Sequence, residues 1–174
     1  PSAGIELRHQ GGRSQVSGQA SIVSDGTNWS MSLEAIDDEG GDAVRLTASL
    51  RDLVPRTLAR VHPAWSPFEA LELPVGISAS ASLSRNGELR NWRALVALGQ
   101  GDVSLAAVSG LRAGMSGGTL DLRYERARRQ IDLMPSSLAW SAGRVTFAGA
   151  LAPDAAGRWL FEVAGIDGEL AAAR

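Results

Sequence analysis

The chain has 174 residues, which is enough for one domain with a sizeable core. Its formal net charge is −2, which argues against a protein that binds the phosphate backbone of nucleic acid. It contains no cysteine, which excludes disulfides, thiolate metal sites and cysteine nucleophiles. The longest stretch without a charged residue, Leu73 to Ser84, is too short and too rich in serine to span a bilayer.

Alternation of apolar and polar residues is the dominant pattern along the chain. Because successive side chains of a strand leave opposite faces, this pattern predicts half-buried antiparallel strands. Turn sequences between the alternating runs, such as Asp25-Gly26 and Asn86-Gly87, predict hairpins. In chain order we expect about ten strands, near residues 4–9, 13–23, 28–36, 43–51, 76–84, 89–98, 102–108, 118–125, 129–141 and 143–164, the last being a hairpin of two.

One segment, DLVPRTLARVHP, departs from the alternation and spaces its apolar residues at helical intervals. Asp52 is placed to cap the helix, Pro55 falls in the first turn, and Pro63 is placed to end it. We therefore predict one short helix near residues 53–62.

The fold class that follows is all-β. Many positions on the predicted apolar faces are alanine, which buries little area and leaves space. A sheet with wide apolar faces and only one short helix to cover them must close on itself or leave a groove. We predict a strongly curved antiparallel sheet, either a groove or an open barrel.

Two segments far apart in the chain have similar sequences. Residues 12–37 and 143–167 both open with Gly-Arg, pass a glycine and a polar turn, continue with a tryptophan, and close with Ile-Asp. One interpretation is convergent turn chemistry in two hairpins. The other is a repeat, in which residues 12–142 form about one unit and residues 143–174 open the next unit of a longer protein.

The sequence offers little for catalysis or metal binding. His9 and His62 lie in no recognisable catalytic motif, and no nucleophile-elbow sequence is present. The acidic run IDDEGGD lacks the spacing of a calcium loop. We expect no catalytic residue, metal or cofactor.

The alternating strands supply candidate groove-lining residues. An exposed apolar groove favours an apolar ligand or partner. The candidates are Ile77, Ala79, Ala81, Leu83, Trp92, Ala94, Val96, Leu120, Leu122, Tyr124, Leu138 and Trp140. Four arginines at a predicted turn, Arg123, Arg126, Arg128 and Arg129, are candidates for binding a phosphate or a lipid headgroup, because arginine presents a planar fork of donors. The alternative is a solvated turn whose charges discourage aggregation.

Residues 50–105 resemble the YhdP-like branch of the AsmA/TamB superfamily. The resemblance rests on a DLVP helix start, an LPVG strand start, a G-x-L hairpin and a GxG step leading into GGTLDLRYERARRQIDLMPSSLAW. It implies a periplasmic protein of a Gram-negative bacterium, anchored in the inner membrane outside this segment, whose β repeats form a hydrophobic groove.

The resemblance also implies a function and partners. We expect a non-enzymatic segment of a lipid-transfer protein that maintains the outer membrane and holds acyl chains of phospholipid or another lipid. Its other partners would be neighbouring repeats of the same chain, and no nucleic acid. The alternative is a structural or assembly module that binds a partner protein through a sheet edge.

Overall fold

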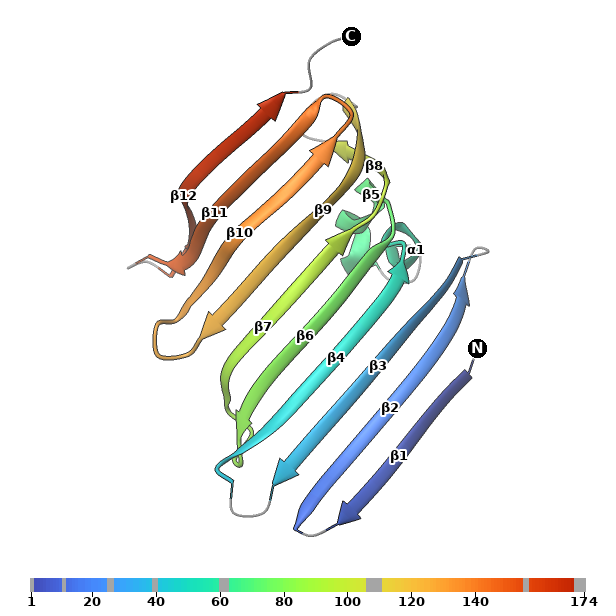
Figure 1. Cartoon of the computed structure of the whole chain (residues 1–174), viewed down its shortest axis with the longest axis vertical. Coiled ribbons are helices and arrows are strands. Elements are labelled where there is room, and N and C mark those ends of the chain that lie inside the picture. The colour runs from blue at the N-terminus through green and yellow to red at the C-terminus, as the bar shows by residue number, and fades with distance from the viewer. Residues whose placement is uncertain are drawn as a thin grey trace.

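The computed structural model describes residues 2–10, 12–24, 27–38, 41–59, 63–105, 111–154 and 157–170. These residues form one sheet of 12 strands, and every neighbouring pair is antiparallel (Figure 1). The order across the sheet is β1-β2-β3-β4-β6-β7-β9-β10-β11-β12, with β8 pairing to β5 and β9. The prediction of an all-β antiparallel fold is confirmed.

The elements have the following bounds. The strands are β1 (Ser2–Gln10), β2 (Arg13–Ser24), β3 (Thr27–Asp38), β4 (Ala43–Leu53), β5 (Leu71–Glu72), β6 (Val75–Ser84), β7 (Leu89–Leu98), β8 (Gly101–Leu105), β9 (Leu111–Glu125), β10 (Gln130–Trp140), β11 (Gly143–Pro153) and β12 (Trp159–Leu170). A short α-helix, α1 (Arg56–Ala59), and a 3₁₀ helix, η1 (Pro63–Ala70), lie between β4 and β5.

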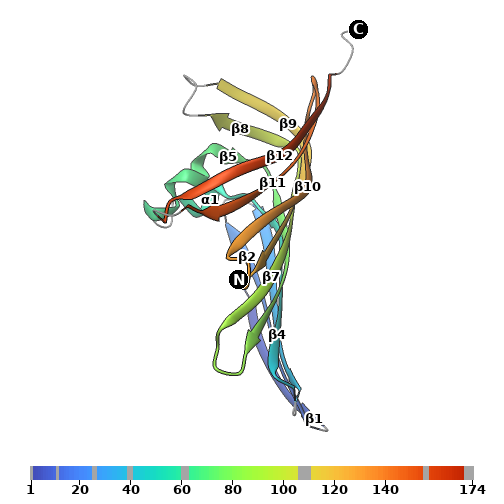
Figure 2. The same ribbon diagram turned by 90° about the vertical axis from the view of Figure 1, so that its left-hand side faces the viewer.

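The helical segment covers only one end of one face of the sheet. Figure 2 shows it on the same side as the β5–β8 pair. The buried apolar residues of the described part of the chain gather there: Leu53, Ala59, Leu73 and Val75. On the opposite face of the sheet at this end, Ala97 is exposed to solvent, so the helical segment covers one face only.

The predicted strong curvature is wrong. The sheet is neither closed nor strongly curled, and β1 and β12 are its two separate edges (Figures 1 and 2). Strands curve sharply where a bulge or glycine kink interrupts the ladder. The pairings from β1 to β4 have no register shift, so this half of the sheet twists without curling.

The predicted helix is present but begins later than expected, at Arg56. Asp52 does not cap it; it is the last-but-one residue of β4, with a positive φ of 58°, at a shift in the β4–β6 register. Pro55 directly precedes α1, as its missing N–H allows. Pro63 begins η1 instead of ending a helix, and residues 60–62 of the predicted helix lie outside the described residues.

Both segments of the suspected repeat form hairpins, β2–β3 and β11–β12. In β3, Trp29 precedes Leu33, which pairs with Gly18. In β12, Trp159 precedes Val163, which pairs with Gly149, and the spacing is the same. The two tryptophans also lie on the same face of the sheet. The hairpins differ in one respect, because a register shift adjoins Gly149 and none adjoins Gly18. The repeat itself stays a prediction.

Strand β9 bends where it passes from pairing with β8 to pairing with β7. Its first residues stand away from the sheet together with β8, on the side of the helical segment (Figure 2). Gly118 lies at this bend, and a Cβ there would come within 2.9 Å of both Leu138 Cδ2 and the Ser137 carbonyl oxygen. The close packing of β9 on β10 therefore requires glycine at this position.

Replacing Gly118 with alanine should lower the free energy of unfolding by about 1–3 kcal/mol, because the backbone of β10 must shift. Gly76→Ala, in the central strand β6, is the control, since its Cβ would meet neighbours only at 3.7 and 3.8 Å. It should change stability by no more than about 0.5 kcal/mol. Urea denaturation measures both, and equal effects would contradict this account of the bend.

Candidate functional site

One row of side chains crosses the sheet in direct register and is apolar in every strand. Directly paired residues of antiparallel strands point to the same face. The row is Leu7, Val16, Ala35, Leu46, Ala81, Trp92, Tyr124, Ile131, Leu151 and Phe161. We call the face that carries this row the apolar face.

The neighbouring row, one residue along each strand, points to the opposite face. It consists of Glu6, Ser17, Glu34, Thr47, Ser80, Arg93, Arg123, Asp132, Ala150 and Glu162. Every member except alanine is polar or charged. We call this side the polar face, so the sheet is amphipathic from one edge to the other.

The register places all twelve candidate lining residues on the apolar face, distributed over β6, β7, β9 and β10. Trp92 and Tyr124 stack within this group, with ring centroids 6.3 Å apart. The sequence-based set is nevertheless incomplete. It omits the outer strands, where Ile5, Leu7 and Phe161 point to the same face. The same alternation of apolar and polar residues, in IELRH and in WLFEV, identifies these residues in the sequence.

Much of the apolar face is open to solvent. Leu7 is 72% exposed, Leu33 50% and Ile166 69%, although all three point to this face. The chain exposes 11608 Å² of accessible surface. A compact monomer of 18.2 kDa exposes about 8,100 Å². The difference follows from an architecture of one layer, in which no second sheet covers the first.

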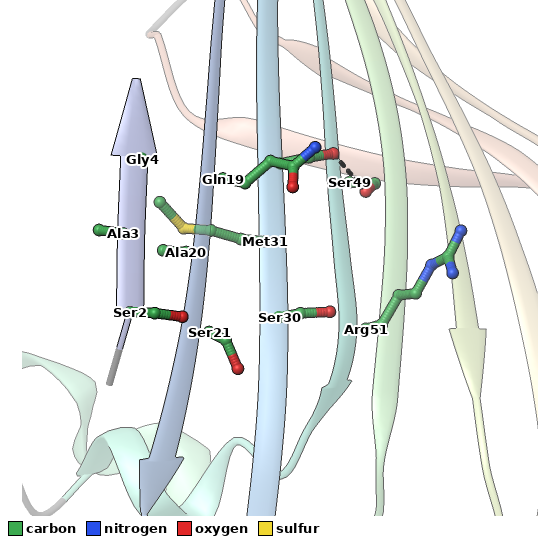
Figure 3. A pocket seen from close by; sticks show the side chains of 11 residues that line it. Ser2, Ala3, Gly4, Gln19, Ala20, Ser21, Ser30, Met31, Ser49 and Arg51 are labelled. Atoms are coloured by element: carbon green, nitrogen blue, oxygen red, sulfur yellow. Dashed lines mark hydrogen bonds between the residues drawn. The ribbon is translucent and has the colours of Figure 1, made fainter. Parts of the chain in front are cut away.

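The polar face carries a shallow hollow of about 530 Å³ over β1 to β4 (Figure 3). Figure 3 shows Ser30 and Arg51 on one side of the strands, and Met31 on the other. Ser32 and Ser49 hydrogen-bond across the strands at 2.8 Å. The lining residues include no histidine or carboxylate, so this hollow offers hydrogen-bonding groups without an acid–base pair.

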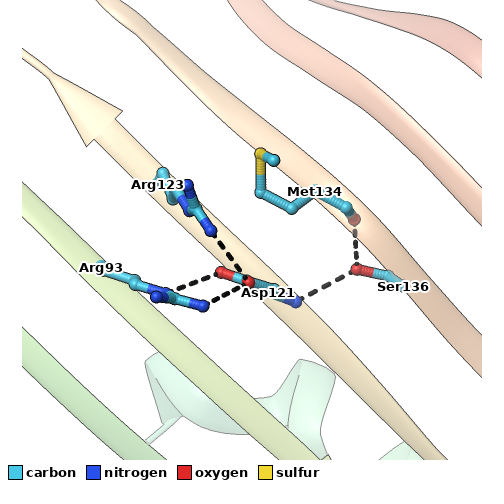
Figure 4. A network of polar contacts seen from close by, with 5 residues as sticks. All are labelled: Arg93, Asp121, Arg123, Met134 and Ser136. Carbon is cyan, nitrogen blue, oxygen red and sulfur yellow. Dashed lines mark hydrogen bonds and ion pairs between the residues drawn. The ribbon is translucent and has the colours of Figure 1, made fainter.

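A polar network lies at the centre of the polar face (Figure 4). Asp121 accepts two hydrogen bonds from Arg93, at 3.1 and 2.7 Å, and forms an ion pair with Arg123 at 3.5 Å. The hydrogen bond from Arg93 is the main reason that the pKa of Asp121 lies below its ordinary value, and partial burial opposes it. Buried Ser136 accepts from the Asp121 backbone N–H and donates to the Met134 carbonyl, which fills the gap at the β10 bulge.

Three of the four candidate headgroup arginines already pair with carboxylates. Arg123 belongs to the network just described. Arg126 forms an ion pair with Glu88 at 2.6 Å, which lowers the pKa of Glu88, and Arg128 pairs with Asp132 at 3.0 Å. Carboxylates thus already occupy these guanidinium groups. Arg129 lies at the β9–β10 turn and is exposed.

The described histidine does not form a catalytic triad. His9 Nδ1 lies 3.0 Å from Ser14 Oγ, and Asp37 stands opposite Ser14 on the other side, where it pairs with Arg85. Ser14 therefore lies between His9 and Asp37, whereas a catalytic triad requires the histidine to lie between the serine and the aspartate. His62 lies outside the described residues. The expectation of a non-enzymatic protein stays a prediction.

Within the described ranges, no group of three or more histidine and acidic side chains is placed to hold a metal ion. Of the helices in these ranges, none has the length and apolar character needed to span a membrane.

Comparison with known proteins gives no assignment. The chain matches no protein-family model, and no curated protein or solved structure shows significant similarity to it. The resemblance carried by residues 50–105 therefore stays a prediction.

The Arg93–Asp121 pair should make stability depend on pH. A carboxylate whose pKa is lowered on folding stabilises the fold above its unfolded value, about 4, and this contribution is lost as the pH falls through the lower folded value. Arg93→Gln should therefore be less stable than the wild type at neutral pH, and the difference should shrink in acid.

Urea denaturation at neutral and acid pH tests this. Arg45→Gln is the control, because Arg45 is also exposed on the polar face and forms no ion pair with the described residues. A deficit of Arg93→Gln that is as large in acid as at neutral pH would contradict the role of the Asp121 charge.

Proposed function

We propose that this chain holds acyl chains of lipid against the apolar face, as a segment of a periplasmic lipid-transfer protein that maintains the outer membrane. The observation that supports it most strongly is the row from Leu7 to Phe161, which is apolar in all ten strands of the main order. Soluble monomers rarely leave an apolar patch of more than a few hundred Å² uncovered. A ligand or partner must therefore cover this face.

The dimensions of the face suit acyl chains. Ten strands spaced by about 4.8 Å give an apolar row about 43 Å long. One acyl chain of a bilayer lipid spans about 15 Å, half the hydrocarbon core. The face is therefore long enough for several chains side by side, while the headgroups stay in water.

The mechanism is partition without specific contacts. Each methylene moved from water onto an apolar surface contributes about 0.8 kcal/mol, so a long chain is held by area alone. A surface that varies little along its length also lets the chain slide, because no single position binds it much more tightly than the next. This combination suits transfer better than storage.

A structural or assembly module is the second candidate. Strand β1 is exposed along all nine residues, and β12 is the other free edge of the sheet. Free edges present unpaired backbone groups that a strand of another protein could join. This function needs the edges but not the apolar face, which distinguishes it from lipid binding.

Two leucines on opposite faces provide a matched test. Leu33 on the apolar face is 50% exposed, and Leu95 on the polar face is 45% exposed. Leu33→Glu places a charge among the acyl chains and should weaken binding of a fluorescent phospholipid about tenfold, the equivalent of losing a large part of one buried leucine. Leu95→Glu should leave binding unchanged.

The measurement is phospholipid transfer from vesicles to the purified chain, with lipid also identified by native mass spectrometry. Circular dichroism confirms that both variants fold. If the wild type takes up no phospholipid, or if both variants bind equally well, lipid binding on the apolar face is refuted. A lipid-free dimer in solution would favour the assembly module.

A further inference from the structure

The apolar face contains a half-open hollow, at the end where β9 bends. Its volume is about 460 Å³, and its lining side chains include Val103, Ala113, Met115, Leu138 and Trp140. The register places all five on the apolar face. Small-molecule sites typically have volumes of about 300–1,000 Å³, so the hollow is large enough for a discrete ligand.

The hollow exists because β8 and the first part of β9 stand up from the sheet. Figure 2 shows both on the side of the helical segment, so they form a wall and β10 forms the floor. Gly118 permits the bend at the foot of the wall.

The floor of the hollow has no free strand edge. At Leu138 and Trp140, β10 pairs with β9 on one side and with β11 on the other, whereas residues 111–114 in the wall pair with β8 alone. A peptide that adds to a sheet needs a free edge. The floor therefore favours a ligand that is bound through apolar contacts.

A second, polar hollow adjoins the first across the end of the sheet. It has a volume of about 320 Å³, and its lining includes Ser116, Arg144 and Glu169 on the polar face. Trp140 and Ser141 line both hollows, so the two meet at the β10–β11 turn. Arg144 and Glu169 stand opposite each other in register, and neither forms an ion pair with the described residues.

An apolar hollow that continues into a charged one matches an amphiphile. We propose that this corner is a specific, saturable site for one acyl chain, which passes beside Trp140 and whose anionic head lies at the β10–β11 turn beside Arg144. The inference rests on the proposed function and sharpens it. Most of the apolar face binds chains by partition, and the corner is the place where a chain stops.

The test uses stearate brominated on its chain, which quenches tryptophan fluorescence on contact. The wild type should show a saturable phase of quenching, and Trp140→Phe should lose the fluorescence change of that phase. Ala113→Phe fills the hollow and should weaken the saturable phase about tenfold. Ala35→Phe, the same change elsewhere on the apolar face, is the control and should leave it intact.

Charge variants test the position of the head. Arg144→Gln should weaken binding of the stearate about two- to fivefold, and Glu169→Gln should strengthen it by a similar factor, because both charges are exposed. Opposite effects of the two variants cannot arise from a general loss of stability. Equal or absent effects would overturn the placement of the head.

The outcomes separate this inference from the proposed function. If stearate and phospholipid do not bind at all, both fail. If they bind but quenching is never saturable, or if Ala113→Phe and Ala35→Phe behave alike, the specific site is refuted while partition on the apolar face stands.

Discussion

A sheet of one layer that places its apolar side chains on a single face cannot bury that face by itself. In this protein the helical segment covers only the end around Leu53 and Val75, and the rest of the apolar face stays open. The large accessible surface and the scarcity of fully buried apolar side chains in the described residues both follow from this constraint. The proposed lipid role is one physical way to satisfy it.

The polar face explains how such a sheet can hold together with only a small core. Antiparallel pairing satisfies the backbone, and cross-strand pairs such as Arg93 with Asp121 add charge-assisted hydrogen bonds. Ion pairs of exposed groups contribute little individually, so the ladder itself must supply most of the stability. A bulge then lowers stability unless a side chain hydrogen-bonds the backbone groups that it leaves unpaired, as the Ser136 hydroxyl does in β10. An acyl layer on the opposite face would add the burial that the protein alone lacks.

Strands and their faces could be predicted because alternation is a local consequence of strand geometry. What could not be predicted depends on partners distant in sequence. Asp52 was expected to cap a helix, but pairing of β4 with β6 draws it into the strand with a positive φ. Residues 111–117 lie outside the predicted strands, yet they belong to β9, because β8 and β10 both pair with this stretch. Curvature depends on bulges, which alternation does not reveal.

The absence of cysteine makes the central claim directly testable, since any introduced cysteine is unique. Single cysteines placed one at a time from Asn28 to Ala35 in β3, each carrying a nitroxide label, report the polarity around each position. With phospholipid bound, labels at Trp29, Met31, Leu33 and Ala35 should move to an apolar environment, and those between them should stay in water. A uniform response along the strand, or no response to phospholipid, would contradict the account.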